Sequence, residues 1–88
     1  MKISYDPNKN NRNLLLRNLS FDLVSDFDWK NALVWQDTRF FYPEPRFIAL
    51  GKIEQRVYVI CFTPIEDGIR VISFRKANKR EVRRYVQK

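Results

Sequence analysis

The side chains that could do chemistry in this chain are mostly arginines and lysines, and they are concentrated at one end. The last nineteen residues contain eight basic side chains and one acidic side chain, Glu81, so this segment carries the whole net charge of +7. Arginine binds phosphate oxygens through two parallel hydrogen bonds. The pattern therefore favours a polyanion or an acidic protein as partner, and a solvated charged face is the alternative.

Histidine is absent from the sequence, which limits the chemistry available. The absence excludes Ser-His-Asp and Cys-His triads, the usual zinc sites and ribonuclease mechanisms that use paired histidines. With two glycines there is no glycine-rich phosphate loop, and the acidic cluster of Asp22, Asp26 and Asp28 has no further hard ligand nearby. We therefore expect neither a metal nor a cofactor. Catalysis would have to use Arg, Lys, Tyr, Asp or Glu.

Capping residues and hydrophobic periodicity divide the chain into elements. Asp6 is a suitable N-cap, and Pro7 fits the first helical position. Asn78 precedes Glu81 by three residues, the spacing of a capping box, and Asp67-Gly68 is typical of a hairpin turn. We expect an extended piece at 2–5, helices at 7–17 and 21–28, strands at 32–35, 46–53, 56–63 and 69–75, and a final helix from residue 79.

This order predicts one α+β domain over residues 1–88, with two N-terminal helices, a four-stranded antiparallel sheet and a C-terminal helix (ααββββα). The connections between strands are too short for parallel crossovers. No apolar stretch approaches the roughly 20 residues of a membrane span, and no signal peptide opens the chain. The single Cys61, in an apolar run, is expected to be a buried thiol in a cytoplasmic protein.

Strand alternation predicts where the basic residues lie. Along the last strand, Arg75 should share a face with residues 69, 71 and 73, and Lys76 should lie on the other face with Arg70. Hairpin pairing should bring Arg56 near Arg75, while Arg46 and Lys52 share a face of the preceding strand. Aromatic residues near this sheet, namely Phe47, Tyr58 and Tyr85, could stack on unpaired RNA bases. The pattern does not separate RNA binding from RNA cleavage.

Several motifs resemble the BrnT toxins, and together they cover essentially the whole chain. The similar segments are residues 5–9, 13–14, 20–21, 44–51, 56–63 and 69–77, followed by Glu81 and Tyr85. The resemblance implies a RelE-like ribonuclease fold and a toxin of a type II toxin–antitoxin pair. It also implies metal-independent RNA cleavage, inhibition of translation, and a ribbon-helix-helix antitoxin similar to BrnA, which binds operator DNA and could hold the toxin as a dimer within the complex.

The resemblance also implies site residues. Arg56, Arg75 and Tyr85 match the positions of catalytic residues best, and Arg46 and Lys52 match by region. The family usually has Lys-His-Gly where this chain has Leu16-Arg17-Asn18. If that histidine contributes to activity, this chain would be weakened or rely on Arg17.

As a mechanism, we expect a ribose 2′-OH to attack the adjacent phosphorus, with Arg56 and Arg75 stabilising the developing charge. The candidates for proton transfer are Lys52, Glu54 and Tyr85. Four of these five residues have a structural alternative: Arg56 as a solubilising charge, Arg75 as the partner of Glu81, Tyr85 as part of an apolar stripe, and Glu54 as a turn residue. The residues expected to bind flanking RNA are Arg46, Lys76, Lys79, Arg80, Arg83 and Arg84.

A non-catalytic module of the same fold, binding nucleic acid or only the antitoxin, is the alternative to the ribonuclease. The loop of Phe40, Phe41 and Tyr42 is a candidate for antitoxin contact, and core packing is the other interpretation of these rings.

Overall fold

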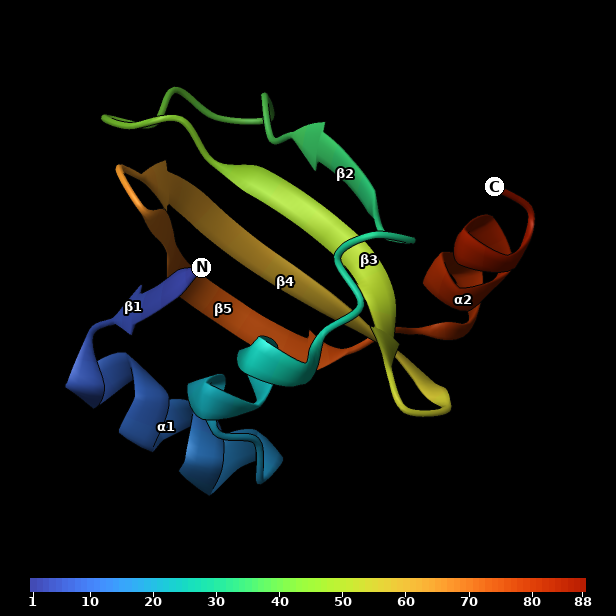
Figure 1. Cartoon of the computed structure of the whole chain (residues 1–88), viewed down its shortest axis with the longest axis horizontal. Helices are drawn as coiled ribbons and strands as arrows, with labels where there is room; N and C mark the ends of the chain where they lie inside the picture. The colour runs from blue at the N-terminus through green and yellow to red at the C-terminus, as the bar shows by residue number, and fades with distance from the viewer.

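Five strands form one curved sheet in the order β1-β5-β4-β3-β2 (Figure 1). The structure is a computed structural model that describes residues 1–88. The strands are β1 (Lys2–Tyr5), β2 (Leu33–Gln36), β3 (Phe47–Ile53), β4 (Arg56–Ile65) and β5 (Gly68–Lys76). The pairs β2–β3, β3–β4 and β4–β5 are antiparallel, as predicted, but β1 pairs with β5 in parallel. The expected four-stranded antiparallel sheet is thus a five-stranded mixed sheet.

Gly68 explains why the extended piece at the N-terminus becomes a strand. The hairpin turn consists of Glu66 and Asp67, and Gly68 already pairs with Ile65 as the first residue of β5. A Cβ atom at residue 68 would lie 1.9 Å from the carbonyl oxygen of Lys2. Neither glycine of the chain has a positive φ. Gly68 is therefore needed for the close approach of β1 rather than for the turn that the Asp-Gly pair suggested.

The helices begin and end largely where the capping residues predict. Helix α1 (Pro7–Arg17) starts at Asp6, which accepts a hydrogen bond from the backbone N–H of Asn8, and ends at Asn18 with a left-handed φ of 56°. The second helix is a 3₁₀ helix, η1 (Phe21–Asp26), shorter than the predicted α-helix. Helix α2 (Lys79–Val86) has the predicted capping box. The element order is β-α-η-β-β-β-β-α, which corrects the expected ααββββα.

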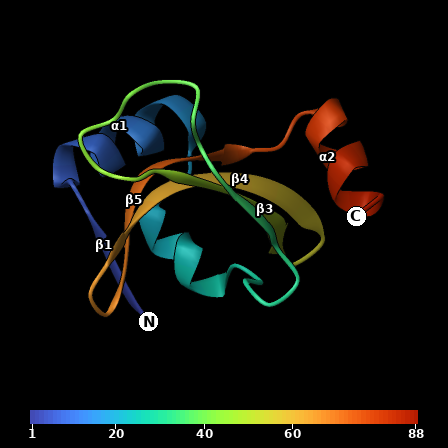
Figure 2. The ribbon, with the colours of Figure 1, turned by 90° about the horizontal axis from the view of Figure 1, so that it is seen from above.

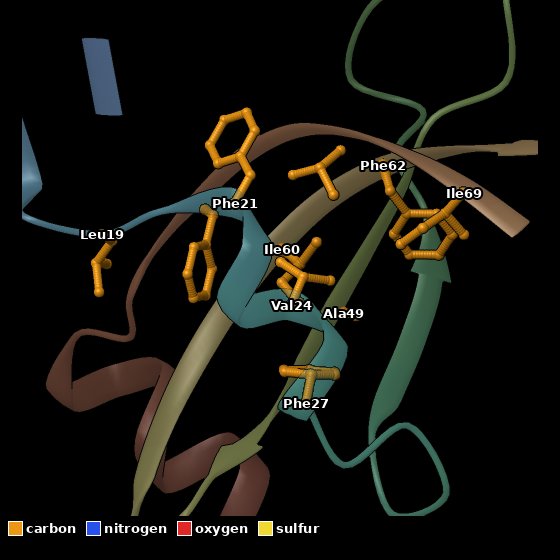
Figure 3. Packing of buried hydrophobic residues seen from close by; sticks show 10 residues of the cluster. Leu19, Phe21, Val24, Phe27, Ala49, Ile60, Phe62 and Ile69 are labelled. Atoms are coloured by element: carbon orange, nitrogen blue, oxygen red, sulfur yellow. The ribbon is translucent and has the colours of Figure 1, made fainter. Parts of the chain in front are cut away.

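The two faces of the sheet are covered by different elements. We call the first the η1 face, because η1 packs on it over a core of ten buried residues (Figure 3): Leu19, Phe21, Val24, Phe27, Ala49, Ile60, Phe62, Ile69, Val71 and Phe74. The other is the α2 face, where Tyr85 of α2 packs with Leu50, Val57 and Val59. In Figure 2, η1 (cyan) lies below the sheet, and α2 (red) lies beyond the right-hand end of the sheet. Part of the α2 face therefore remains uncovered.

A β-bulge changes which residues of β5 share a face. Cys61 pairs with Ser73, but Phe62 pairs with Val71, so Ile72 is an extra residue in β5. As a result Val71 lies in the same core cluster as Phe74. The predicted alternation is wrong on the N-terminal side of the bulge, because strict period-2 counting takes no account of an inserted residue. Arg70 and Arg75 therefore lie on the same face, the α2 face.

None of the helices could span a membrane, since the longest, α1, has 11 residues.

Candidate active site on the α2 face

Arg75 on the α2 face is paired with Glu81 of α2. Nη1 and Nη2 of Arg75 donate to the two carboxylate oxygens of Glu81 at 2.8 and 2.9 Å, and Nη1 also donates to the carbonyl of Lys76 at 3.3 Å. Arg75 lowers the pKa of Glu81 below its usual value, and Glu81 raises the pKa of Arg75. The alternative of an Arg75–Glu81 pair is thus confirmed, yet Nε–H and one N–H of Nη2 have no protein acceptor.

Glu81 is itself fixed by the start of α2. Its Oε1 atom also accepts the backbone N–H of Asn78 at 2.9 Å, and the Asn78 side chain accepts the N–H of Glu81 in return. One carboxylate therefore caps the helix and orients the guanidinium group of Arg75.

A groove of about 300 Å³ opens beside this ion pair. Its floor is formed by Ile48 of β3 and Val59 of β4, and one wall by Arg75 and Glu81. The opposite wall is the start of the β2–β3 loop, residues 37–39. The groove lies at the lower end of the size range of ligand pockets. An anion in it would meet cationic side chains on both walls.

Asp37 organises the loop that forms the second wall. Its side chain is 1% exposed and accepts hydrogen bonds from Nε and Nη2 of Arg39, both at 2.9 Å, and from the hydroxyl of Tyr42 at 2.9 Å. These donors, Arg39 first, hold the pKa of Asp37 well below its usual range, and desolvation is the main cause that raises the pKa of Tyr42. The Arg39 side chain is itself 69% exposed. The loop thus presents a fixed guanidinium group to the groove.

Arg46 extends this arrangement along the loop. Its guanidinium carbon lies 4.4 Å from the ring centroid of Tyr42, a cation–π contact. Its Nε atom is buried and has no hydrogen-bond acceptor. Cys61 is half-buried on this face rather than fully buried as predicted, and burial is the main cause that raises its pKa.

A second basic cluster lies where α1 meets the end of β5. Arg17, Arg75 and Lys76 line a cavity of about 210 Å³ there. Helix α1 reaches this position because Asn13, buried on its inner side, donates from Nδ2 to the carbonyl of Phe74 at 2.9 Å. The structure therefore brings Arg17 beside Arg75, although the two are far apart in the sequence.

The other predicted RNA-binding residues lie on α2. Arg80, Arg83, Arg84 and Lys88 line a shallow basic surface together with Leu33. The guanidinium carbon of Arg84 lies 4.1 Å from the ring centroid of Trp35, and Trp35 also lines the groove. This surface is therefore continuous with the groove.

The structure does not bring Arg56 and Arg75 together. Arg75 pairs with Val59, whose side chain lies on the α2 face, whereas Arg56 alternates with Val57 and so shares the η1 face with Tyr58. The expected juxtaposition is wrong because Val59 is three positions after Arg56, an odd offset that puts the two side chains on opposite faces. Whether Arg56 takes part in catalysis stays a prediction.

None of the predicted proton-transfer residues lines the groove beside Arg75. Lys52 shares the α2 face, but Val57 and Val59, which pack with Tyr85, occupy β4 between Lys52 and Arg75. Glu54 is exposed in the β3–β4 turn with a φ of 55°, and Tyr85 is 7% exposed in the core of the α2 face. The turn and apolar-stripe alternatives are confirmed for Glu54 and Tyr85, and their catalytic roles stay predictions.

The aromatic residues near the groove are different from those predicted. Phe47 stacks on Phe62, and Tyr58 packs on Phe74, so both belong to the η1 face. Trp35 of β2 lines the groove instead, and Phe40, Phe41 and Tyr42 lie in the β2–β3 loop that follows. Sequence reasoning missed Arg39 and its partner Asp37, although an acidic and a basic residue two positions apart directly after a strand could have indicated an ordered loop.

The comparison with protein families settles the class of protein. A family model described as the ribonuclease toxin, BrnT, of type II toxin–antitoxin systems matches residues 5–81. The chain belongs to the BrnT family. No curated protein matches the chain.

Membership confirms the resemblance seen in the sequence and makes the chain a ribonuclease toxin of a type II toxin–antitoxin system, which implies an antitoxin as partner. The BrnT match starts in β1 and ends at Glu81, so it includes Arg75, Glu81 and the loop around Asp37. The match stops before Arg83 and Arg84, so it gives no support for a role of these two residues in RNA binding.

Proposed function

We propose that this BrnT-family toxin cleaves single-stranded RNA without a metal ion, by attack of a ribose 2′-OH on the adjacent phosphorus. The 2′-OH gives its proton to solvent, the bond from phosphorus to the 5′ oxygen breaks, and the leaving oxygen takes a proton from solvent, so that the products are a 2′,3′-cyclic phosphate and a 5′-hydroxyl. No three His, Cys, Asp or Glu side chains are grouped so that they could hold a metal ion. The proposed reaction depends instead on fixed cations. Cleavage of messenger RNA in the cytoplasm would inhibit translation.

The observation that carries this proposal is the way Glu81 orients Arg75. A guanidinium group held by two hydrogen bonds keeps its remaining N–H groups in fixed directions, and here they belong to a residue that lines the groove. Preorganised donors of this kind stabilise the charge that develops on phosphate oxygens. Arg39, on the opposite wall, would bind the same or the neighbouring phosphate.

The carboxylates of the groove fit a supporting role. The oxygens of Asp37 and Glu81 already accept several hydrogen bonds each, and both groups have a lowered pKa. They would remain ionised at neutral pH and position Arg39 and Arg75. We propose that charge stabilisation, rather than a strong general base, supplies most of the rate enhancement.

The flanking RNA would follow the basic surface on both sides of the groove. On one side, the basic surface continues from the groove past Trp35 to Arg80, Arg83 and Arg84 on α2. At the end of β5, it continues to Lys76 and Arg17. Lys79, at the start of α2, and Arg46, on the loop, are the other proposed phosphate contacts. The backbone carbonyl of Arg46 accepts a hydrogen bond from the N–H of Asp37, which lines the groove.

We propose that a ribbon-helix-helix antitoxin neutralises the toxin by covering this cationic groove. Acidic residues of the antitoxin would replace the phosphates, so that toxin activity and antitoxin binding compete. Operator DNA would be contacted by the antitoxin, and any dimer of the toxin would form within that complex.

The test is induced expression of the wild-type chain and of Arg75→Ala, with and without the product of the adjacent gene. We expect growth arrest and cleaved RNA only for the wild type expressed alone. Intact RNA together with salt-sensitive RNA binding would show a non-catalytic module instead. No RNA binding even at low salt would leave only the interaction with the antitoxin.

A further inference from the structure

Two phenylalanines at the tip of the β2–β3 loop are exposed to solvent. Phe41 is fully exposed, and Phe40 is 69% exposed. Core packing of these two rings, one of the interpretations of the sequence, is therefore excluded. Their position needs another explanation, because the base of the same loop is tightly bonded through Asp37.

The loop separates the groove from a second cavity of about 350 Å³. Phe40, Phe41 and Tyr42 line this cavity together with Glu44 and Arg46. The carboxylate of Glu44, 3.6 Å from Nη1 of Arg70, supplies hydrogen-bond acceptors at this cavity. Aromatic faces and hydrogen-bond acceptors in one small cavity are groups that bind a nucleobase.

We propose that the tip of this loop binds an unpaired base of the RNA, with Phe41 as the main stacking surface. Residues 37 and 38 line both cavities, Arg39 lines the groove alone, and residues 40–46 line the second cavity alone. A single-stranded RNA that crosses the loop would place a phosphate between Arg39 and Arg75 and a neighbouring base against Phe41. This inference rests on the proposed RNA cleavage.

The charges around the loop favour RNA over a protein as the occupant. Arg39 and Arg46 flank the two phenylalanines, and the guanidinium carbon of Arg39 lies 6.0 Å from the ring centroid of Phe40. Planar rings between guanidinium groups are typical of single-strand binding, where bases stack and phosphates pair with arginine. The other exposed apolar patch, Leu14 to Leu16 on α1, is aliphatic and offers no stacking surface.

The test compares variants that separate stacking from apolar contact. Phe41→Ala removes the side chain, Phe41→Leu keeps an apolar side chain without a π face, and Phe41→Trp keeps the π face. Leu15→Ala, at a residue that is 87% exposed on α1, is the matched control. The probe is a short single-stranded RNA with methylated 2′ hydroxyls, which binds without being cleaved, measured by fluorescence anisotropy at several salt concentrations.

We expect the Ala and Leu variants to bind this RNA about 5- to 150-fold more weakly, the effect of losing one stacked base. Phe41→Trp and Leu15→Ala should bind like the wild type. The salt dependence should not change, because no phosphate contact is removed. Melting curves of each variant verify the fold.

Wild-type affinity of Phe41→Leu would overturn the stacking proposal, since the contact would then be apolar only. Unchanged affinity of Phe41→Ala would overturn it as well. If the wild type cleaves natural RNA through Arg75 while these variants behave normally, the loop inference alone has failed. If the wild type neither binds nor cleaves RNA, the proposed function fails together with it.

Discussion

Arg75 illustrates how a residue can be both structural and available for chemistry. Its ion pair with Glu81 ties β5 to the start of α2 and leaves two N–H groups unpaired. The pair is partly exposed, with 38% of the Arg75 side chain accessible, so solvent screens it and its contribution to stability is small. The main effect of the pair would be to hold an N–H donor of Arg75 in a fixed direction toward the groove.

We predict that Arg75→Ala lowers the single-turnover rate of RNA cleavage by about 100-fold or more, the usual cost of losing a donor to a developing oxyanion. Arg75→Lys should be nearly as damaging, because an ammonium group cannot make the two parallel bonds to Glu81. Arg56→Ala, on the other face, should have a clearly smaller effect. Lys30→Ala, at an exposed position in the loop before β2, is the control. Equal losses for Arg56→Ala and Arg75→Ala would contradict a site confined to the α2 face.

Glu81 predicts a pH dependence of stability. Its pKa is lowered in the folded protein, so the stabilisation is fully present above its unfolded value of about 4.5 and is lost as the pH falls through the lower folded value. When the pH is lowered from neutral to below that folded pKa, the free energy of unfolding should therefore fall less for Glu81→Gln than for the wild type. Thermal melts across this range measure the difference. Asp26→Asn, a carboxylate without any side-chain hydrogen bond or ion pair, should keep the wild-type slope.

At the level of elements, the prediction was most accurate where local chemistry decides. The caps Asp6, Asn18 and Asn78 gave the boundaries of α1 and the start of α2, because each satisfies backbone groups within a few residues. The sequence did not show the parallel pairing of β1 or the bulge at Ile72. The pairing of β1 depends on a contact between segments that are distant in the chain, whereas the bulge inserts one residue into the β4–β5 hairpin, which period-2 alternation does not reveal. Because the prediction took no account of the bulge, it placed Arg70 on the wrong face of the sheet.

Gly68 offers a direct test of the β1 contact. Gly68→Ala would force its Cβ against the backbone of Lys2, and backbone cannot yield as a flexible side chain can. We expect a loss of about 1–3 kcal/mol in the free energy of unfolding, the usual cost of overpacking. Urea denaturation measures the loss, and hydrogen exchange should show faster opening at the Lys2 N–H, which donates to Asp67. Glu66→Ala, an exposed residue of the same turn, should be close to neutral; similar losses for both variants would contradict this role of Gly68.

For the whole molecule, the fold redistributes charge that the sequence concentrates at one end. The first sixty-nine residues are neutral in sum, but α1 contains Lys9, Arg12 and Arg17 and no acidic residue. Lys9, Arg12 and Arg17 line a cavity with Ser73 of β5, next to the cluster of Arg75 and Lys76. The basic surface therefore combines both ends of the chain. Net charge counted along the sequence could not have predicted this.

We predict that removing the charges of α1 weakens RNA binding through phosphate contacts alone. The double variant Lys9→Gln, Arg12→Gln should lower the salt slope of RNA affinity by about 0.7 for each phosphate that is no longer neutralised. The cleavage rate at saturating RNA should stay unchanged. Lys2→Gln, on the edge strand β1, is the control, and an unaltered slope in the double variant would exclude α1 from the RNA path.

Cleavage by the ribose 2′-OH, promoted by Arg75 in the groove of the α2 face without a metal ion, would leave a chemical signature on the RNA ends. The most direct measurement is the end-group analysis of RNA incubated with the purified chain in excess EDTA, for the wild type and for Arg75→Ala. We predict fragments ending in 2′,3′-cyclic phosphate for the wild type and intact RNA for the variant, which should still bind RNA. Fragments that disappear with EDTA, or that Arg75→Ala produces at the wild-type rate, would contradict this mechanism.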